Sequence, residues 1–267
     1  MRLADPMRSL VLATALPAAL LTFPGCSTLS PDTPAPYKPN PLGNGLRIAD
    51  VQNPKSPSYA PNQNVDLTSL TVLWVDTFDE TKDGKSLGTV FVEDVGSTAP
   101  YSAISVYQPS YVPADLRPVG GDVLDFAGPY QEVAGIGAAH FAAGETLPQL
   151  AKPVGTFRYE YQTPAPTEIR LSDLDDYAAG RQWEGMLVTV RDVYALSAAS
   201  SGGRVTYTLA SSPDAGTDVN TVTMSNEEYD LSSTEFPPGT HLQSVTGLVT
   251  WFFSYHIAPR YPSDVVQ

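Results

Sequence analysis

Short apolar runs separated by turn residues dominate the second half of this chain and much of the first. Val188-Thr189-Val190-Arg191-Asp192-Val193 alternates apolar and polar side chains, which is the period of a half-buried strand. Clusters such as Ser201-Gly202-Gly203 and Pro237-Pro238-Gly239 interrupt the runs and indicate turns. The pattern predicts strands at 67–75, 88–93, 102–107, 122–128, 185–194, 204–210, 221–225 and 241–251. One short helix is expected over 174–177, capped by Ser172 or Asp173.

Two stretches of the chain resemble each other. Leu46-Arg47-Ile48-Ala49-Asp50-Val51 matches Ile169-Arg170-Leu171-Ser172-Asp173-Leu174 at an offset of 123 residues, and Gly128 matches Gly247 at an offset of 119 residues. Chance similarity between short β-rich stretches is the alternative. The near-constant offset favours duplication of one fold, and the chain beyond residue 45 is long enough for two domains.

The second stretch also resembles a known family. Trp183-Glu184-Gly185-Met186-Leu187-Val188-Thr189-Val190, preceded by 166–174 and followed by Ile257-Ala258-Pro259 and Asp264, is similar to the OB-like domains attached to secreted bacterial endonucleases. The resemblance covers 166–267 and reaches 46–155 through the repeat. It implies an OB-type barrel but no nuclease activity, because the catalytic domain of those nucleases has no counterpart in this sequence. We therefore expect an all-β protein with two tandem OB-like Greek-key barrels, at 46–160 and 168–267, joined by a linker at 161–167.

The amino-terminal segment predicts export. An apolar run over 10–23 follows Arg2 and Arg8 and ends just before Cys26, the only cysteine. This layout resembles the bacterial lipobox, although Phe23 and Pro24 depart from its commonest form. The resemblance implies a signal peptide at 1–25 and acylation of Cys26 with palmitate-type chains, followed by a disordered proline-rich tether at 26–45. A buried free cysteine and a membrane-spanning helix are the alternatives, but the apolar run is shorter than the roughly 20 residues that a spanning helix needs. Met7 is an alternative start.

The net charge of the chain argues against DNA as a partner, and the residue that follows Cys26 indicates which membrane would hold the anchor. Without residues 1–25 the chain has 13 basic and 28 acidic side chains, a net charge of −15. Such a surface repels phosphate backbones, so we expect no DNA binding. Ser27 follows the cysteine where Asp would resemble inner-membrane retention, so we expect a lipid anchor in the outer membrane of a Gram-negative bacterium.

No catalytic or cofactor motif stands out. His140, His241 and His256 lack the spacing of a metal or catalytic motif, although His241 and His256 could meet across a sheet. The acidic run 76–84 and the cluster Asp173, Asp175 and Asp176 could bind calcium, but solvated turns are the simpler interpretation. We therefore predict no cofactor, no metal and no enzymatic activity.

Aromatic side chains are the remaining candidates for a binding site. OB barrels bind oligonucleotides or oligosaccharides on one face, where aromatic rings stack on bases or sugars. The candidates are Tyr101, Tyr107, Tyr111, Trp251 and Tyr255, although the core is the preferred place for Trp251 and Phe253. The sequence thus predicts a lipid-anchored, non-enzymatic envelope protein that binds or scaffolds an envelope protein or glycan. Two alternatives are an oligonucleotide- or glycan-binding module that acts beside an extracellular enzyme, and a metal-dependent hydrolase.

Overall fold

The computed structural model describes residues 45–85, 87–134, 145–214 and 220–267. The described part is all-β, as predicted, with 47% strand and 8% helix. The expected signal peptide, Cys26 and almost all of the expected tether lie outside the described residues, as does His140. In the part of the chain that is described, no helix is both long enough and apolar enough to cross a membrane.

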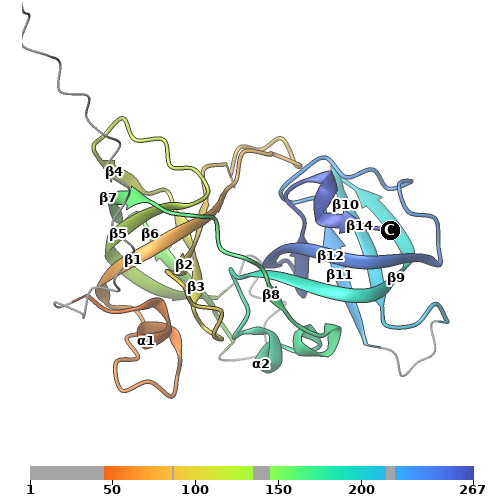
Figure 1. The fold of residues 1–267 in the computed structure, drawn as a ribbon, viewed down its shortest axis with the longest axis horizontal. Helices are drawn as coiled ribbons and strands as arrows, with labels where there is room; N and C mark the ends of the chain where they lie inside the picture. Colours follow the sequence, from red (N-terminus) through yellow and green to blue (C-terminus); the bar gives the residue numbers. More distant parts are fainter. Residues whose placement is uncertain (1–44, 86, 135–144, 215–219) are drawn as a thin grey trace, which may run out of the picture. The chain divides into compact units, whose positions relative to one another are not determined.

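The first copy is a closed five-stranded barrel (Figure 1, orange to green). Its strands follow each other around the barrel in the order β1-β2-β3-β6-β5, and β5 pairs back with β1. β7 and β4 extend the sheet beyond β5. The strands are β1 (Asn64–Val75), β2 (Val90–Asp94), β3 (Ala103–Tyr107), β4 (Ser110–Val112), β5 (Asp122–Val133), β6 (Leu147–Ala151) and β7 (Val154–Glu160).

The second copy repeats this topology (Figure 1, teal to blue). Its barrel has the order β9-β10-β11-β13-β12, closed by pairing of β12 with β9. In both barrels the third and fifth strands pair in parallel, β3 with β6 and β11 with β13. The strands are β8 (Thr167–Glu168), β9 (Leu187–Ser201), β10 (Arg204–Ala210), β11 (Thr221–Ser225), β12 (Thr240–Trp251), β13 (Tyr255–Ala258) and β14 (Val265–Val266). The prediction of two tandem OB-like barrels is therefore confirmed.

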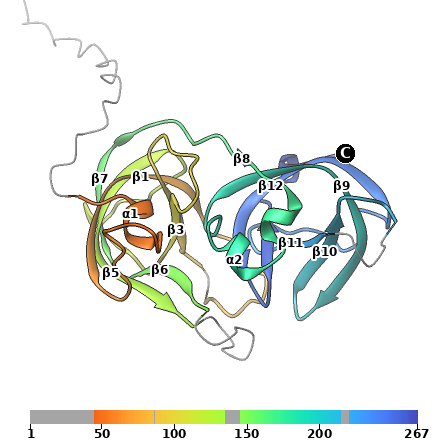
Figure 2. The ribbon, with the colours of Figure 1, turned by 90° about the horizontal axis from the view of Figure 1, so that it is seen from below.

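Four short helices complete the described structure. α1 covers one end of the first barrel, as the view in Figure 2 shows. The bounds are α1 (Ile48–Gln52), a 3-10 helix at Leu171–Leu174, α2 (Tyr177–Gly180) and a 3-10 helix at Pro262–Asp264. The single helix expected over 174–177 is wrong: the chain forms two helices here, and Asp176 caps the second by accepting a hydrogen bond from the N–H of Ala179 at 2.8 Å.

The repeated Arg-x-x-Asp sequence performs the same task in both copies. The N–H of Arg47 donates to the Asp50 carboxylate at 3.0 Å, and the N–H of Arg170 donates to the Asp173 carboxylate at 2.9 Å. Each aspartate thereby satisfies a backbone donor at the start of a short helix. The short segment before each helix also pairs in parallel with the first strand of its barrel. Local chemistry thus explains why this motif recurs.

Buried residues of the two copies pack against each other. Leu73, Phe91 and Ala103 of the first copy belong to the same hydrophobic cluster as the core of the second barrel. A buried ion pair lies beside this cluster, in which Arg181 contacts Glu132 at 2.8 Å and donates to the Gln52 side chain at 3.1 Å. The contact between the copies therefore contains both apolar surface and buried charge.

Candidate functional site

The second barrel carries a hollow of about 470 Å³. It lies between the turn that joins β9 to β10 and the turn that joins β12 to β13. In an OB barrel these are the first-to-second and fourth-to-fifth strand loops, which flank the ligand face. The lining residues come from these turns and the adjoining strands: Ala199, Ser201, Gly202, Arg204, Thr206, Ser225, Asn226, Glu227, Phe252, Phe253 and His256.

The β9–β10 turn is a two-residue hairpin, as its Ser-Gly-Gly sequence predicts. Ser201 pairs with Arg204, and Gly202 and Gly203 have φ values of 60° and 90°. Glycine adopts such values without strain, which suits the tight turns of hairpins. A Cβ atom at Gly203 would lie 2.1 Å from the carbonyl oxygen of Glu80, so this position also lets the first copy approach the turn.

The β12–β13 turn presents aromatic rings to the hollow. Phe252 and Phe253 meet edge to face, with ring centroids 4.4 Å apart. Phe253 has a positive φ of 67° and is 50% exposed, so its expected place in the core is wrong. Trp251, in contrast, packs against the core of the second barrel as expected. The turn therefore exposes the Phe253 ring, which the sequence analysis placed in the core.

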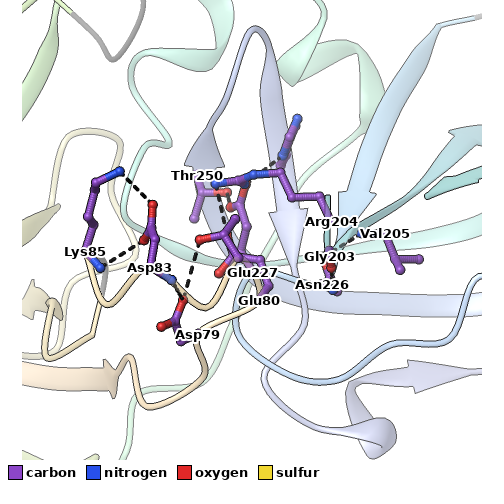
Figure 3. A network of polar contacts seen from close by, with 12 residues as sticks. Asp79, Glu80, Asp83, Lys85, Gly203, Arg204, Val205, Asn226, Glu227 and Thr250 are labelled. Atoms are coloured by element: carbon purple, nitrogen blue, oxygen red, sulfur yellow. Dashed lines mark hydrogen bonds and ion pairs between the residues drawn. The ribbon is translucent and has the colours of Figure 1, made fainter. Parts of the chain in front are cut away.

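Arg204 forms the cationic wall of the hollow. Its guanidinium contacts the Glu80 carboxylate at 2.9 Å and the Glu227 carboxylate at 3.5 Å (Figure 3). It also lies 4.1 Å from the ring centroid of Phe252, a cation–π contact. Two carboxylates and an aromatic ring therefore already satisfy this cation.

His256 is held in place by Glu227. Its Nδ1 atom lies 3.0 Å from a Glu227 oxygen, and the Thr250 hydroxyl donates to the other oxygen of the same carboxylate. Burial alone would raise the pKa of Glu227, but His256, Thr250 and Arg204 together hold that pKa below its ordinary value. Glu227 is thus an ionised group that orients the imidazole at the edge of the hollow.

A smaller cavity of about 150 Å³ adjoins the hollow and shares Arg204, Glu227 and Phe252 with it. The first copy contributes Asp76, Glu80, Thr89 and Phe91 to its lining, and the second contributes Arg204, Glu227, Glu228, Thr250, Trp251 and Phe252. Burial raises the pKa of Glu80 and that of Glu228, the latter well above its ordinary value, and neighbouring carboxylates add to both shifts.

The five aromatic residues predicted from the sequence do not form one binding face. Trp251 lines the smaller cavity, whereas the other four line neither cavity. Tyr101 lies at the β2–β3 turn, Tyr107 ends β3 and Tyr111 lies on β4, all in the first copy. Tyr255 is only 2% exposed and packs edge to face on Trp251, so its ring is not available for stacking on a ligand.

The polar candidates also separate into different environments. His241 lies near Asp192 and Tyr194, while His256 pairs with Thr250 at the other end of β12, so the two histidines do not meet. In the acidic run, Asp79 accepts backbone hydrogen bonds from within its own turn, as expected for a solvated loop. Asp76 and Glu80 of the same run are instead buried, with exposed fractions of 4% and 6%. No group of His, Cys, Asp and Glu side chains among the described residues is arranged to hold a metal ion.

Sequence reasoning missed most of the hollow. Arg204, Glu227, Phe252, Phe253 and His256 come from three separate segments of the chain, and no motif connects them. Two segments of the sequence could have indicated the hollow. The glycine turn at 202–203 and the aromatic run at 251–255 occupy the two loops that an OB barrel uses for binding. Comparison with protein-family models finds no matching family, and comparison with curated proteins finds no match.

Proposed function

We propose that this chain is a non-enzymatic, lipid-anchored binding protein of the bacterial cell envelope, and that its ligand is a glycan held in the hollow of the second barrel. The observation that carries the proposal is the position of the hollow. It lies between the two loops that OB barrels use to bind oligosaccharides or oligonucleotides, and an exposed phenylalanine borders it.

The charges around the hollow favour a sugar over a nucleic acid. Arg204 is the only Lys or Arg among the described residues that line it, and Glu80 and Glu227 already pair with this guanidinium. A phosphate would have to displace a carboxylate to reach the cation. A neutral sugar needs only a ring to stack on and a polar group for its hydroxyls, which Phe253 and Ser201 provide.

Phe253→Ala tests the binding site. We expect the variant to lose at least about tenfold in affinity for oligosaccharides released from cell-envelope glycan, which is about 1.4 kcal/mol. Isothermal titration calorimetry with such oligosaccharides measures the effect. Val119→Ala is the matched control, because Val119 is an exposed apolar residue of the first copy. Equal affinities for the two variants, or no binding by the unmodified protein, would remove the basis of the proposal.

We expect no significant binding of DNA at physiological salt. Phosphate neutralisation supplies essentially all non-specific affinity for DNA, and this chain has a net charge of −14. Stacking on one or two aromatic rings contributes about 1–3 kcal/mol per base, which is too little against a repulsive field. Fluorescence titration of labelled single- and double-stranded oligonucleotides at about 0.15 M salt, where the screening length is about 8 Å, measures this. Micromolar or tighter binding would show the charge argument to be wrong.

We expect Cys26→Ala to release the protein from the membrane fraction or to leave the precursor uncleaved. The proposal rests on the position of this cysteine after an apolar segment and before a proline-rich one. Stable anchoring takes more than one acyl chain, so loss of the acylated residue should abolish it. Fractionation of cells followed by mass spectrometry of the mature amino terminus checks the result, and Ser27→Ala is the control. Unchanged membrane association of the Cys26 variant would contradict the lipid anchor.

One observation favours a hydrolase as the second candidate. His256 is oriented by a carboxylate at the edge of the hollow, which is a geometry that general bases use. Incubation of the unmodified protein with the bound oligosaccharide, followed by product analysis, distinguishes the two functions. Cleavage that is lost in His256→Gln would support a hydrolase, whereas an intact ligand after prolonged incubation supports a binding protein.

A further inference from the structure

The loop between β1 and β2 of the first copy reaches the β9–β10 hairpin of the second. Its Glu80 carboxylate contacts the Arg204 guanidinium at 2.9 Å, whereas Glu227 lies 3.5 Å from the same guanidinium (Figure 3). The backbone of Glu80 also approaches the hairpin, because a Cβ atom at Gly203 would lie 2.1 Å from the Glu80 carbonyl oxygen. Glu80 therefore meets the hairpin with both its main chain and its side chain.

The contact between Glu80 and Arg204 is fixed and shielded. Backbone hydrogen bonds close the base of the loop: the N–H of Asp76 donates to the Thr89 carbonyl at 2.8 Å, and the N–H of Gly88 donates to the Asp76 carbonyl at 2.8 Å. The Glu80 side chain is only 4% exposed. Salt and water screen a buried contact of this kind much less than one at the surface. The first copy thus presents a well-placed anion to Arg204.

Arg204 links Glu80 to the aromatic turn between β12 and β13. Its guanidinium lies 4.1 Å from the centroid of the Phe252 ring. The Arg204 side chain is 30% exposed, so without Glu80 it could turn toward solvent and regain rotamer freedom. Glu227 is farther away and is already engaged by two other side chains. The cation–π contact with Phe252 therefore depends on Glu80.

Phe253 needs support from its neighbours because its backbone is strained. It has a φ of 67°, in the left-handed region that bulky residues rarely adopt, and its ring is half exposed. Strained residues persist only where surrounding contacts determine their conformation. One such contact is the edge-to-face packing on Phe252, which Arg204 holds in turn. Loss of Glu80 should therefore loosen the ring on which the proposed glycan stacks.

We propose that Glu80 of the first copy is a positioning residue for the hollow of the second barrel, because it holds Arg204 against Phe252 and so keeps Phe253 in its exposed orientation. The inference rests on the glycan-binding function proposed above. In an OB barrel the loop between the first two strands flanks the ligand face. In the first copy this loop instead supports the ligand face of the second.

Calorimetric titration of the full mature protein with envelope oligosaccharides tests the proposal. We expect Glu80→Ala to lower the affinity at least about fivefold, the lower end of the usual coupling between linked sites. Glu80→Gln retains a side-chain oxygen for the guanidinium, so it should bind more tightly than Glu80→Ala. Asp83→Ala is the matched control and should bind like the unmodified protein, because Asp83 belongs to the same loop but is exposed and pairs with Lys85.

Gly203→Ala perturbs the same contact from the side of the second barrel. The added Cβ would clash with the Glu80 carbonyl oxygen, so this variant should also lose affinity. Gly239→Ala is its control and should retain affinity. Gly239 has a φ of 85°, close to the 90° of Gly203, but a Cβ added there would meet no atom within 4 Å. Thermal unfolding shows which variants are folded.

NMR spectra of the ligand-free protein provide a measurement that a loss of stability alone would not change. The Phe252 ring should shift the resonances of the Arg204 side-chain protons near its face, and Phe252→Leu gives the reference without this ring. Glu80→Ala should move the Arg204 resonances toward that reference, whereas Asp83→Ala should leave them in place.

The outcomes separate this inference from the proposed function. If the unmodified protein binds the oligosaccharides and folded Glu80→Ala binds them equally well, the positioning role is overturned and the proposed function stands. Unchanged Arg204 resonances in Glu80→Ala would likewise overturn the positioning role. Absence of binding by the unmodified protein would contradict the proposed function and, with it, the inference that rests on it.

Discussion

Arg181→Ala should lower the free energy of unfolding by about 3–5 kcal/mol, the cost of removing one partner from a buried ion pair. The Arg181 side chain is 9% exposed and contacts Glu132, whose side chain is 7% exposed, at 2.8 Å. It also donates to the Gln52 side chain and lies close enough to Glu184 to affect the pKa of that group. Removing the guanidinium leaves the buried Glu132 carboxylate without its cation.

Urea unfolding followed by tryptophan fluorescence measures this effect. Arg191→Ala is the matched control, because Arg191 also pairs with a glutamate, Glu168, but both side chains are more than half exposed. Exposed ion pairs contribute little to stability, so the control should unfold like the unmodified protein. Equal midpoints for the two variants would show that the buried pair does not hold the two copies together.

Stability should fall as the pH rises from about 4 to about 8. Burial raises the pKa of Glu93 to about 8, that of Asp94 to about 7 and that of Glu184 to about 8. The folded protein therefore keeps protons in this range that the unfolded chain releases, and linkage makes folding less favourable at higher pH. Each pKa unit corresponds to about 1.4 kcal/mol, so the melting temperature should be several degrees higher at pH 5 than at pH 8.5. Glu227, whose pKa is lowered, acts in the opposite direction only below about pH 4.5.

Glu93→Gln isolates the contribution of one of these three groups. Glutamine can still accept the hydrogen bond that the Ser102 hydroxyl donates at 3.1 Å, but it cannot ionise. The variant should gain more than about 1 kcal/mol of stability at pH 8.5, since one pKa unit alone is worth about 1.4 kcal/mol, and change little at pH 5. Glu168→Gln, at an exposed position, is the control. Thermal unfolding across this pH range checks both variants, and a melting temperature that rises with pH would contradict the assignment.

The sequence predicted the barrels because their determinants are local or periodic. Apolar runs and glycine turns place strands, and the Arg-x-x-Asp motif caps a helix in each copy through contacts three residues apart. The strand prediction was less accurate about the face of the strand on which each side chain lies. Thr189 was expected on the polar face of β9, yet it is 5% exposed and its hydroxyl pairs with that of Thr246 at 2.7 Å.

The sites depend on tertiary contacts that sequence periodicity does not contain. Asp76 and Glu80 belong to a run of charges that is typical of a solvated loop, yet both are buried and line a cavity that residues of the second barrel complete. Glu227, Thr250 and His256 lie on three segments that meet because β11 and β12 both pair with β13. Phe253 is exposed because it lies in a turn, where it has a positive φ. The apolar residues around it in the sequence did not predict this turn.

Mapping of backbone amide shifts during titration with envelope oligosaccharides tests the central claim most directly. The account predicts that the largest changes occur at the β9–β10 turn and the β12–β13 turn, at Gly202, Arg204, Phe252, Phe253 and His256. Amides of β4 and β7 in the first copy should not respond. Saturable changes that are confined to the first barrel, or spread evenly over both barrels, would contradict the claim that the hollow of the second barrel is the binding site.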